Sequence, residues 1–420
     1  MSTEKEQDLM HDVIIIGAGA SGLAAARLLT AAGREVVLLE ARDRTGGRIW
    51  TDYSHGAVEL GAEFIHGDQA CTWADVEAAN LRTRPWGSRR FFARGGQILP
   101  TNDPFAARVF ALYAAVADYR GPDLSVAQLL ARLAPANDPA VPITLRWLCN
   151  LEGAEPERLS AAAYAREREQ SSNGEGNFHI LDGYSRLVEA MAAGLQIRLN
   201  APVREVRWER GAVTLTLEHG ESLEASRLLV TVPVSLLQAG VPSFTPELPA
   251  TRRAAIHAIP MGQVTKVAVW FERQRWPDFT VLSSDGRIAT WWPVAGASTP
   301  TLMGYQGGPT ARAVAAMGEA DALEVALDEL TQLFGPAVRA AYLGGRLVDW
   351  NADPWSRGAY TYSAVGMGAA RATLAAPLDD TIFFAGEATA EGGHIATVHG
   401  AIESGRRAAR ELLMMSSDTP

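Results

Sequence analysis

The residues that most constrain this chain are Gly17-Ala18-Gly19-Ala20-Ser21-Gly22, a G-x-G-x-x-G between two contrasting segments. The β-branched run Val13–Ile16 precedes it and predicts a strand. Residues 22–32 are rich in alanine and leucine and predict a helix that stops at Gly33. Residues 35–39 predict a second strand. This strand–helix–strand opening implies a parallel sheet.

The glycine spacing has a physical purpose at such a crossing. The first glycine permits the tight turn, the second lets the backbone approach a pyrophosphate, and the third lets helix and strand pack closely. The start of the helix offers free N–H groups and partial positive charge to phosphates, which Ala20 and Ser21 would frame. Glu40 lies 18 residues beyond Gly22, placed to accept hydrogen bonds from ribose hydroxyls. A bound dinucleotide is therefore expected.

Length and composition bound the remaining possibilities. A chain of 420 residues exceeds one ordinary core, so two domains are expected. Hydrophobic content of 47% and charged content of 20% are typical of soluble globular proteins. The net charge of −10 argues against nucleic-acid binding, which needs a basic face.

The cysteine usage and the pattern of the first residues predict a cytoplasmic protein. The two cysteines, Cys71 and Cys149, lie in no motif, which suits a reducing compartment. Residues 1–11 lack the order of a signal peptide, and residues 416–420 resemble a frayed tail. No run of 18 apolar residues predicts a membrane span, and no His/Cys/Asp cluster has metal-ligand spacing.

The pattern along the chain predicts an α/β fold, in which a Rossmann-like dinucleotide-binding domain with a parallel sheet carries an inserted α+β substrate-binding domain. Helical composition at 105–117, 124–133 and 158–169 predicts a helix-rich insertion. The expected dinucleotide-binding segments are 1–84, 176–242 and 346–420. The substrate domain is expected to take its helices from 85–175 and its sheet and one helix from 243–345.

The stretch after the second strand carries a family resemblance. Glu40-Ala41-Arg42-Asp43-Arg44-Thr45-Gly46-Gly47-Arg48 resembles the second flavin-contact motif of the flavin-containing amine oxidases. In that family Gly46, Gly47 and Arg48 would run beside the pyrophosphate. A guanidinium at position 48 pairs well with phosphate.

The resemblance extends over most of the chain. It includes Glu59-Leu60-Gly61-Ala62-Glu63-Phe64-Ile65-His66-Gly67, which resembles the strand that passes the flavin ring. Leu181–Tyr184 resembles the motif before the second FAD segment, and Val203 falls where the backbone meets the adenine. Phe384-Ala385-Gly386-Glu387 and Ala396-Thr397-Val398-His399-Gly400-Ala401 resemble the C-terminal signature. The resemblance implies FAD, with Glu387 near its ribityl–phosphate region and residues 396–398 near the flavin.

Lys266 is the first candidate for the chemistry. It interrupts the apolar strand predicted over residues 264–271, where a charge is costly without a partner or a wet cavity. The resemblance implies that this lysine holds a water against flavin N5 and assists reoxidation by dioxygen.

The resemblance also implies an aromatic pair above the flavin and a polar residue at the entrance of the substrate pocket. Trp350 and Tyr360 stand at the separation seen in monoamine oxidases, where the tyrosine forms one wall of an aromatic cage. Ala359 replaces the cysteine that binds flavin covalently there, so FAD is expected to be non-covalent. The second wall of the cage falls at Thr397, near His394. A threonine at this position is more similar to polyamine oxidases and histone demethylases. His66, with Glu63 nearby, falls at the pocket mouth and is expected either to meet substrate or to be structural.

The resemblance implies oxidation of a monoamine or polyamine. Hydride passes to flavin N5, the imine is hydrolysed to an aldehyde or ketone, and dioxygen becomes hydrogen peroxide. The alternatives are an L-amino-acid oxidase, a desaturase or protoporphyrinogen-oxidase-like flavoprotein, an NAD-linked dehydrogenase, and a non-enzymatic flavin-holding interaction module. An amino-acid oxidase would need a carboxylate-binding arginine, for which Arg84, Arg89, Arg90 and Arg94 are the candidates. Neither the individual substrate nor the oligomeric state can be read from the sequence.

Overall fold

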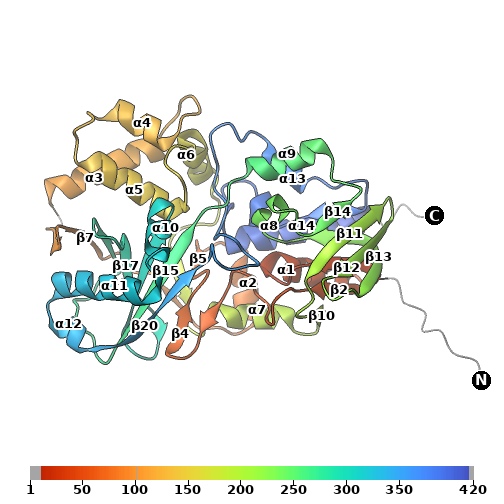
Figure 1. Ribbon diagram of the computed structural model, residues 1–420, viewed down its shortest axis with the longest axis horizontal. Coiled ribbons are helices and arrows are strands. Elements are labelled where there is room, and N and C mark those ends of the chain that lie inside the picture. The colour runs from red at the N-terminus through yellow and green to blue at the C-terminus, as the bar shows by residue number, and fades with distance from the viewer. Residues whose placement is uncertain (1–10, 101, 416–420) are drawn as a thin grey trace, which may run out of the picture.

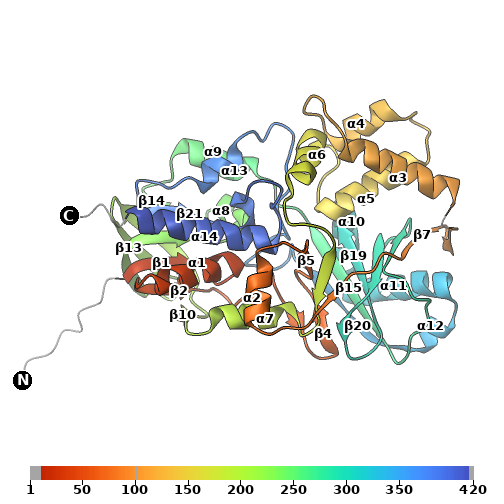
Figure 2. The same cartoon turned by 180° about the vertical axis from the view of Figure 1, so that it is seen from behind.

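The computed structural model describes residues 11–100 and 102–415. Two large sheets lie at opposite ends of an elongated molecule, and short strands lie between them (Figure 1). The expectations about residues 1–10 and 416–420 concern segments outside this description. The two views in Figures 1 and 2 agree that helices α3–α6 gather at the end that holds the second sheet.

The first sheet has eight strands in the order β10-β2-β1-β13-β12-β11-β14, with β21 also paired to β13. β1 runs parallel to β2 and β13, and β13 runs parallel to β21, whereas β11, β12 and β13 form an antiparallel meander. The predicted α/β class with a parallel sheet is therefore confirmed. The strands are β1 His11–Ile16, β2 Val36–Leu39, β10 Ile197–Arg198, β11 Val203–Glu209, β12 Ala212–Leu217, β13 Ser222–Val230, β14 Ser243–Thr245 and β21 Ile382–Phe384.

Helices cover both faces of this sheet. Successive side chains of a strand point to opposite faces, and both sets are apolar here, so each face needs a cover. Ile15 packs into one core and its neighbours Ile14 and Ile16 into another. The first core is closed by α1 Ala20–Ala31, α2 Thr72–Ala78, α7 Tyr184–Ala192 and α14 Val398–Met415. The second is closed by α8 Val234–Gln238, α9 Ala250–Ala258 and α13 Ala370–Ala375.

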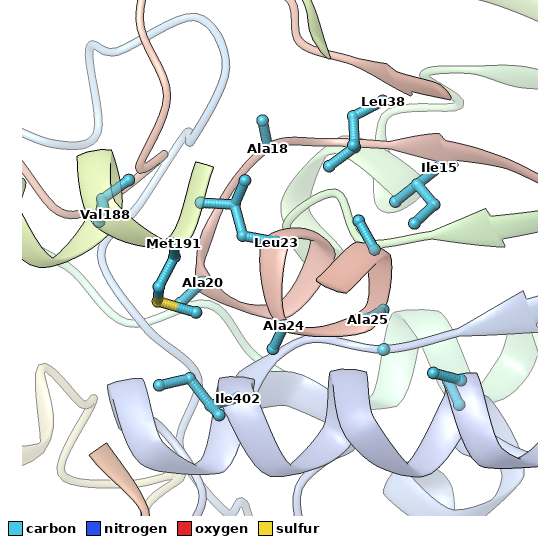
Figure 3. Packing of buried hydrophobic residues seen from close by; sticks show 14 of the residues in the cluster. Ile15, Ala18, Ala20, Leu23, Ala24, Ala25, Leu38, Val188, Met191 and Ile402 are labelled. Atoms are coloured by element: carbon cyan, nitrogen blue, oxygen red, sulfur yellow. The ribbon is translucent and has the colours of Figure 1, made fainter. Parts of the chain in front are cut away.

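Small residues let α1 lie close to its neighbours. Figure 3 shows Leu23 and Ala24 of α1 between the first sheet and Ile402 of α14. A Cβ added at Gly405 of α14 would lie 2.2 Å from the carbonyl oxygen of Ser21, so only glycine permits this approach. The start of α1 is therefore fixed by a helix almost 400 residues away in the chain.

The second sheet has seven strands in the order β20-β15-β19-β17-β16-β7-β8. Helices α10 Pro309–Ala315, α11 Gly318–Phe334 and α12 Ala337–Ala340 pack on one face, and an aromatic cluster lies on the other. Every residue of β15 is buried, which places Lys266 in the interior. The strands are β7 Arg90–Arg94, β8 Gln97–Ile98, β15 Val264–Phe271, β16 Val281–Ser284, β17 Thr290–Pro293, β19 Thr301–Gly307 and β20 Tyr342–Asp349.

Four helices form a separate core beside this sheet: α3 Pro104–Ala117, α4 Val126–Leu133, α5 Ala140–Glu152 and α6 Ala161–Gln170. Asp103, Ser125 and Ser160 cap α3, α4 and α6 with their side chains. The sequence predicts these three helices but not α5. Pro142 lies in the first turn of α5, where proline is tolerated, and obscured its helical pattern.

Short strands connect the two halves of the molecule. β3 Thr51–Asp52, β4 Gly56–Glu59 and β18 Gly296–Ala297 form one small sheet, and β5 Phe64–His66, β6 Thr83–Pro85 and β9 Asn177–Ile180 form another. A 3-10 turn, η1 Glu387–Thr389, follows β21. No helix within the described ranges has both the length and the apolar character needed to cross a membrane.

The core around α1 gives a direct test of the packing. Leu23→Ala removes a fully buried side chain, so the free energy of unfolding is expected to fall by about 2–5 kcal/mol. Leu343→Ala is the control, because Leu343 is 55% exposed and its loss is expected to change stability by less than about 0.5 kcal/mol. Urea unfolding followed by circular dichroism measures both; equal losses would contradict this packing.

Candidate active site

The turn after β1 depends on glycine at two positions. Gly17 has φ +105°, and a Cβ there would lie 2.6 Å from Thr231 Oγ1, which donates to the Ile16 carbonyl oxygen at 2.8 Å. A Cβ at Gly22 would lie 2.0 Å from the Gly17 carbonyl oxygen. These glycines are thus required by the close contact of helix and strand, as the motif predicts.

Three other glycines border free space. A Cβ at Gly19 would meet only the Gly46 carbonyl oxygen, at 3.9 Å, and a Cβ at Gly47 only the Gly19 Cα, at 3.6 Å. A Cβ at Gly386 would meet nothing within 4 Å. Their backbones therefore leave room for a ligand to approach. Gly46 N donates to the Ala18 carbonyl oxygen at 2.8 Å, which brings the two glycine motifs together.

The helix start faces this space without a cap. Gly19 is the N-cap residue of α1 and no side chain caps the helix, while Ala20 and Ser21 begin its buried first turn. Uncapped N–H groups at a helix start are a favourable site for phosphate. The cradle thus fits the pyrophosphate of a dinucleotide.

Glu40 lies at the end of β2, beside the cradle. Its Oε2 accepts from Ala18 N at 2.9 Å and its Oε1 from Arg42 N at 3.0 Å. Ala201 N donates to the Glu40 carbonyl oxygen at 2.8 Å, which brings the segment leading into Val203 and β11 against Glu40 and Ala41. This location is compatible with the ribose and adenine roles, which remain predictions.

Arg42 lies beside Glu40, with its Nη1 3.7 Å from Glu40 Oε1. Its Nη2 donates to Ser356 Oγ at 2.9 Å and pairs with the Asp353 carboxylate. The side chain therefore links residues 40–42 to the loop before Tyr360. A contact of Arg42 with the cofactor remains a prediction.

Arg48 and Glu387 join the first and last parts of the cradle. Arg48 Nη1 lies 2.8 Å from Glu387 Oε1 and also donates to the Ala359 carbonyl oxygen at 2.6 Å. Burial alone would raise the pKa of Glu387, but Arg48 and Arg371 outweigh it and hold that pKa below its usual value. The two residues line a cavity together with Thr231, Val232, Phe384 and Gly386.

Lys266 reaches the segment between the cradle and the second sheet. Its Nζ donates to the carbonyl oxygens of Glu59 at 2.9 Å and Gly61 at 3.0 Å, and to Glu63 Oε2 at 2.8 Å. Ala62 N donates to the Arg48 carbonyl oxygen at 3.1 Å. The structure thus brings Lys266, Gly61, Ala62 and Glu63 together with Arg48.

Trp350 supports the same segment from behind. Its Nε1 donates to the Leu60 carbonyl oxygen at 2.9 Å, and a Cβ at Gly61 would lie 3.1 Å from its ring. Trp350 is 4% exposed, and besides these contacts with residues 60–61 its ring meets that of Trp50 edge-on, with the centroids 6.4 Å apart. A role in lining the substrate space remains a prediction.

Tyr360 has an aromatic partner that was not among the predicted site residues. Its hydroxyl is hydrogen-bonded to the hydroxyl of Tyr305 and donates to the Leu151 carbonyl oxygen at 2.8 Å. Burial raises the pKa of both phenols, so both stay neutral. Tyr305 is opposite Lys266 in the register of β15 and β19. Because Tyr305 and Lys266 are far apart in the chain and meet only through strand pairing, no local sequence pattern indicated this neighbour.

Glu152 is a second residue missing from the sequence prediction. It ends α5, next to Leu151, and is half-buried. Among the described residues, its carboxylate forms no hydrogen bond or ion pair. Burial, reinforced by the nearby charge of Glu167 and opposed by Arg168, raises the pKa of Glu152 to about 7. No sequence pattern indicated Glu152, because α5 itself was not predicted.

The remaining predicted residues lie on β5 and before α14. His66 is exposed, and its Nδ1 is hydrogen-bonded to Asn177 Oδ1 at 2.8 Å. The ring centroids of Phe64 and Trp86 lie 4.6 Å apart, with the ring planes tilted by 36°. Thr397, between Ala396 and Val398, donates to the His394 carbonyl oxygen at 2.7 Å and accepts from Gly400 N at 3.0 Å. These contacts fit a helix cap, and its place as a cage wall remains a prediction.

The fold and the cradle define the class of dinucleotide-binding proteins, and comparison with known proteins specifies the family. The model of the family "Flavin containing amine oxidoreductase" matches residues 20–137 and 144–413. This chain belongs to the flavin-containing amine oxidoreductase family. The predicted family and its FAD cofactor are confirmed, and the protein is an FAD-dependent oxidoreductase of the amine-oxidising type.

Several individual relatives are similar over nearly the whole chain. Polyamine oxidase 4 of Oryza sativa is 30% identical, covering 97% of this chain and 90% of that protein. Human lysine-specific histone demethylase 2 is 30% identical, covering 95% of this chain but 53% of that protein. Cyclohexylamine oxidase from Brevibacterium oxydans shares the fold with a TM-score of 0.83 at 24% identity, covering 97% of this chain and 100% of that one. Putrescine oxidase bound to putrescine has a TM-score of 0.83 at 24% identity, covering 97% and 99%.

The cradle predicts how FAD binding responds to loss of one charge. Arg48→Met removes a charged donor worth about 1.5–3 kcal/mol, so the Kd for FAD is expected to rise roughly tenfold to a hundredfold. Arg204→Met, an exposed arginine on β11, is the control. Titration of FAD into the folded, FAD-free variants measures Kd. An unchanged Kd in Arg48→Met would contradict the assignment.

Proposed function

We propose that this protein oxidises a diamine or polyamine at a carbon next to nitrogen. The observation that carries this substrate class is Glu152, whose carboxylate has no partner among the residues that the structure describes. It directly follows Leu151, the residue whose carbonyl accepts a hydrogen bond from Tyr360. An ammonium group is the natural partner of a half-buried carboxylate. A substrate with one amine at the tyrosine pair and a second cationic group near Glu152 uses both features.

The chain's residues would orient the substrate. Tyr305 and Tyr360 hold each other through their hydroxyls, so both rings are fixed before an amine arrives. Trp292 continues the aromatic surface, with its ring centroid 5.6 Å from that of Tyr305. Electron-rich ring faces also attract a nearby cation. Bound FAD would supply a hydride acceptor for the amine carbon and a route for the electrons to dioxygen, with hydrogen peroxide as the product; the imine released would be hydrolysed to a carbonyl compound.

The cofactor is proposed to be non-covalent. Position 359, where the resemblance to monoamine oxidases calls for cysteine, holds a buried alanine whose methyl group cannot form a bond to flavin. The two free thiols, Cys71 and Cys149, support a cytoplasmic location. The proposed reaction makes the amine substrate and dioxygen the expected small-molecule partners.

Similar proteins support the substrate class by their names. Polyamine oxidase 4 is the name of one relative, and one structural neighbour is a putrescine oxidase with putrescine bound. The amino-acid oxidase alternative has less support. Arg84, Arg89, Arg90 and Arg94 are all exposed, and Arg94 lies over the ring of Phe105.

Anaerobic mixing with amines tests the proposed reaction. Addition of spermidine or 1,4-diaminobutane is expected to bleach the oxidised flavin absorbance, and admission of air is expected to restore it with release of peroxide. The absorbance spectrum and a peroxide assay are the measurements. Bleaching by an L-amino acid but by none of the amines would contradict the proposal.

Glu152→Gln tests the substrate class. The variant is expected to raise KM for spermidine about tenfold or more and to leave KM for butylamine nearly unchanged, because only spermidine has a second cationic group. Glu157→Gln, an exposed residue nearby, is the control.

The pH dependence is expected to follow the same group. The Glu152 carboxyl is neutral below a pKa of about 7 and charged above it, so the spermidine-to-butylamine ratio of kcat/KM should rise as pH increases through about 7. That rise should be absent in Glu152→Gln. An identical rise in the variant would assign the titration to another group.

A further inference from the structure

Two tyrosines of the helical core form a second hydroxyl-bonded pair, here called the outer tyrosine pair. Tyr164 of α6 donates its hydroxyl hydrogen to the hydroxyl oxygen of Tyr113 of α3 at 2.8 Å, and the ring centroids lie 6.4 Å apart with the planes at 77°. Tyr305 and Tyr360, the inner tyrosine pair, are joined in the same way. Two rings that are already held in place can receive a ligand with little further loss of side-chain freedom.

Arg168 lies over both rings of the outer tyrosine pair. It follows Tyr164 by four residues on α6, which places the two side chains on one face of the helix. Its guanidinium carbon lies 5.7 Å from the ring centroid of Tyr164 and 5.7 Å from that of Tyr113. The side chain is exposed, and it forms no ion pair with any residue that the structure describes. A flexible cation thus occupies a position where two electron-rich rings favour positive charge.

Helix α5 connects the outer tyrosine pair with the inner one. The ring centroid of Trp147, in the middle of this helix, lies 4.9 Å from that of Tyr113. One turn later, the carbonyl oxygen of Leu151 accepts the hydrogen bond from Tyr360 at 2.8 Å. Leu151 is 41% exposed, and Glu152 follows it at the end of α5. Both tyrosine pairs and the Glu152 carboxylate are therefore arranged along one helix.

The charges around Glu152 include one cation. The titratable groups that interact with Glu152 are Glu167, Arg168 and Tyr164 of α6, Tyr305, Tyr360, and Cys149 of its own helix. Burial raises the pKa of the three phenols and of the thiol, so these groups stay neutral near pH 7. The Glu167 carboxylate accepts a hydrogen bond from the Ser363 hydroxyl, which holds it in place. Among the described residues, Arg168 is therefore the cation whose charge reaches Glu152.

We propose that the outer tyrosine pair is a cation subsite for the far end of a polyamine, and that Arg168 occupies this subsite until the substrate displaces the guanidinium into solvent. The inference rests on the proposed function, in which one amine lies at the inner tyrosine pair and a second cationic group lies near Glu152. A further cationic group of a longer substrate would then lie over Tyr113 and Tyr164, where the rings attract it.

Displacement of the guanidinium makes Arg168 a specificity-determining residue. A diamine ends near Glu152 and leaves Arg168 in place, so it gains nothing from the outer tyrosine pair. A tetramine gains the attraction of the two rings, but only in molecules from which the guanidinium has moved away. Its apparent affinity is therefore reduced in proportion to the fraction of molecules in which Arg168 covers the rings.

Arg168→Gln tests the displacement. At about pH 8.5, where the Glu152 carboxyl is charged, the variant is expected to lower KM for spermine about tenfold and to change KM for 1,4-diaminobutane by less than about threefold. Arg168→Lys keeps a cation at this position and should stay near the wild type. Arg166→Gln, an equal loss of charge at an exposed position on the same helix, is the matched control. An unchanged KM for spermine, or an equal fall for both amines, would overturn the proposal.

Tyr113→Leu separates displacement from simple repulsion between Arg168 and the substrate. With one ring of the pair removed, the further change Arg168→Gln should lose most of its effect on KM for spermine. Repulsion would act in the same way with or without the ring, so a full tenfold gain in the double variant would overturn the proposal. Tyr113→Gln also removes the ring and takes the place of Tyr113→Leu if that variant fails to fold.

A binding measurement distinguishes the subsite from the proposed function. Spermine is titrated anaerobically into protein whose FAD has been reduced beforehand, so that calorimetry records binding without turnover. Arg168→Gln should bind spermine about tenfold more tightly than the wild type. Failure of every amine to bleach oxidised FAD would contradict the proposed function alone. Equal Kd values for spermine in the two proteins, or no binding by either, would overturn the outer subsite even where amines are oxidised.

Discussion

The contact between Arg48 and Glu387 is the interaction on which the arrangement of the site depends. It joins a loop near the start of the chain to the turn after β21, and through the Ala359 carbonyl it also holds the residue before Tyr360. Thr361 Oγ1 donates to Glu387 Oε2 at 2.7 Å and accepts from Arg371. Arg48 thus pairs directly with the buried Glu387 carboxylate, and Arg371 reaches it through the Thr361 hydroxyl. Removal of Arg48 or of Glu387 would leave a charge in the interior without its ion-pair partner.

The parts of the molecule that local chemistry specifies were predictable from the sequence. The G-x-G-x-x-G turn, the strands beside it and Glu40 follow from residues within one strand–helix–strand unit. Lys266 was predictable because one charge in an apolar strand needs a partner. The identity of that partner was not, since Glu63 lies 203 residues away and comes close only when residues 59–63 pass between the two halves.

Tyr305 and Glu152 show two other limits of sequence interpretation. Tyr305 faces Lys266 because β15 and β19 pair in one register, and a shift by one residue would turn its ring to the opposite face. Glu152 depends on α5, whose proline and irregular polar pattern hid the helix. In both cases the residue type can be read from the sequence, but the neighbours that indicate its role are brought close only by the tertiary structure.

The close contact of α14 with α1 has a consequence for how the protein is made. The phosphate cradle begins within residues 17–22, yet Gly386 and Glu387 border it, and Gly405 lies directly against the Ser21 backbone. During translation, the first strand and helix are made before Gly386, Glu387 and Gly405, so the cradle is incomplete until those residues have been added. A complete cofactor site can therefore form only after residues 386–405 have been translated, and chains released before that point would lack it.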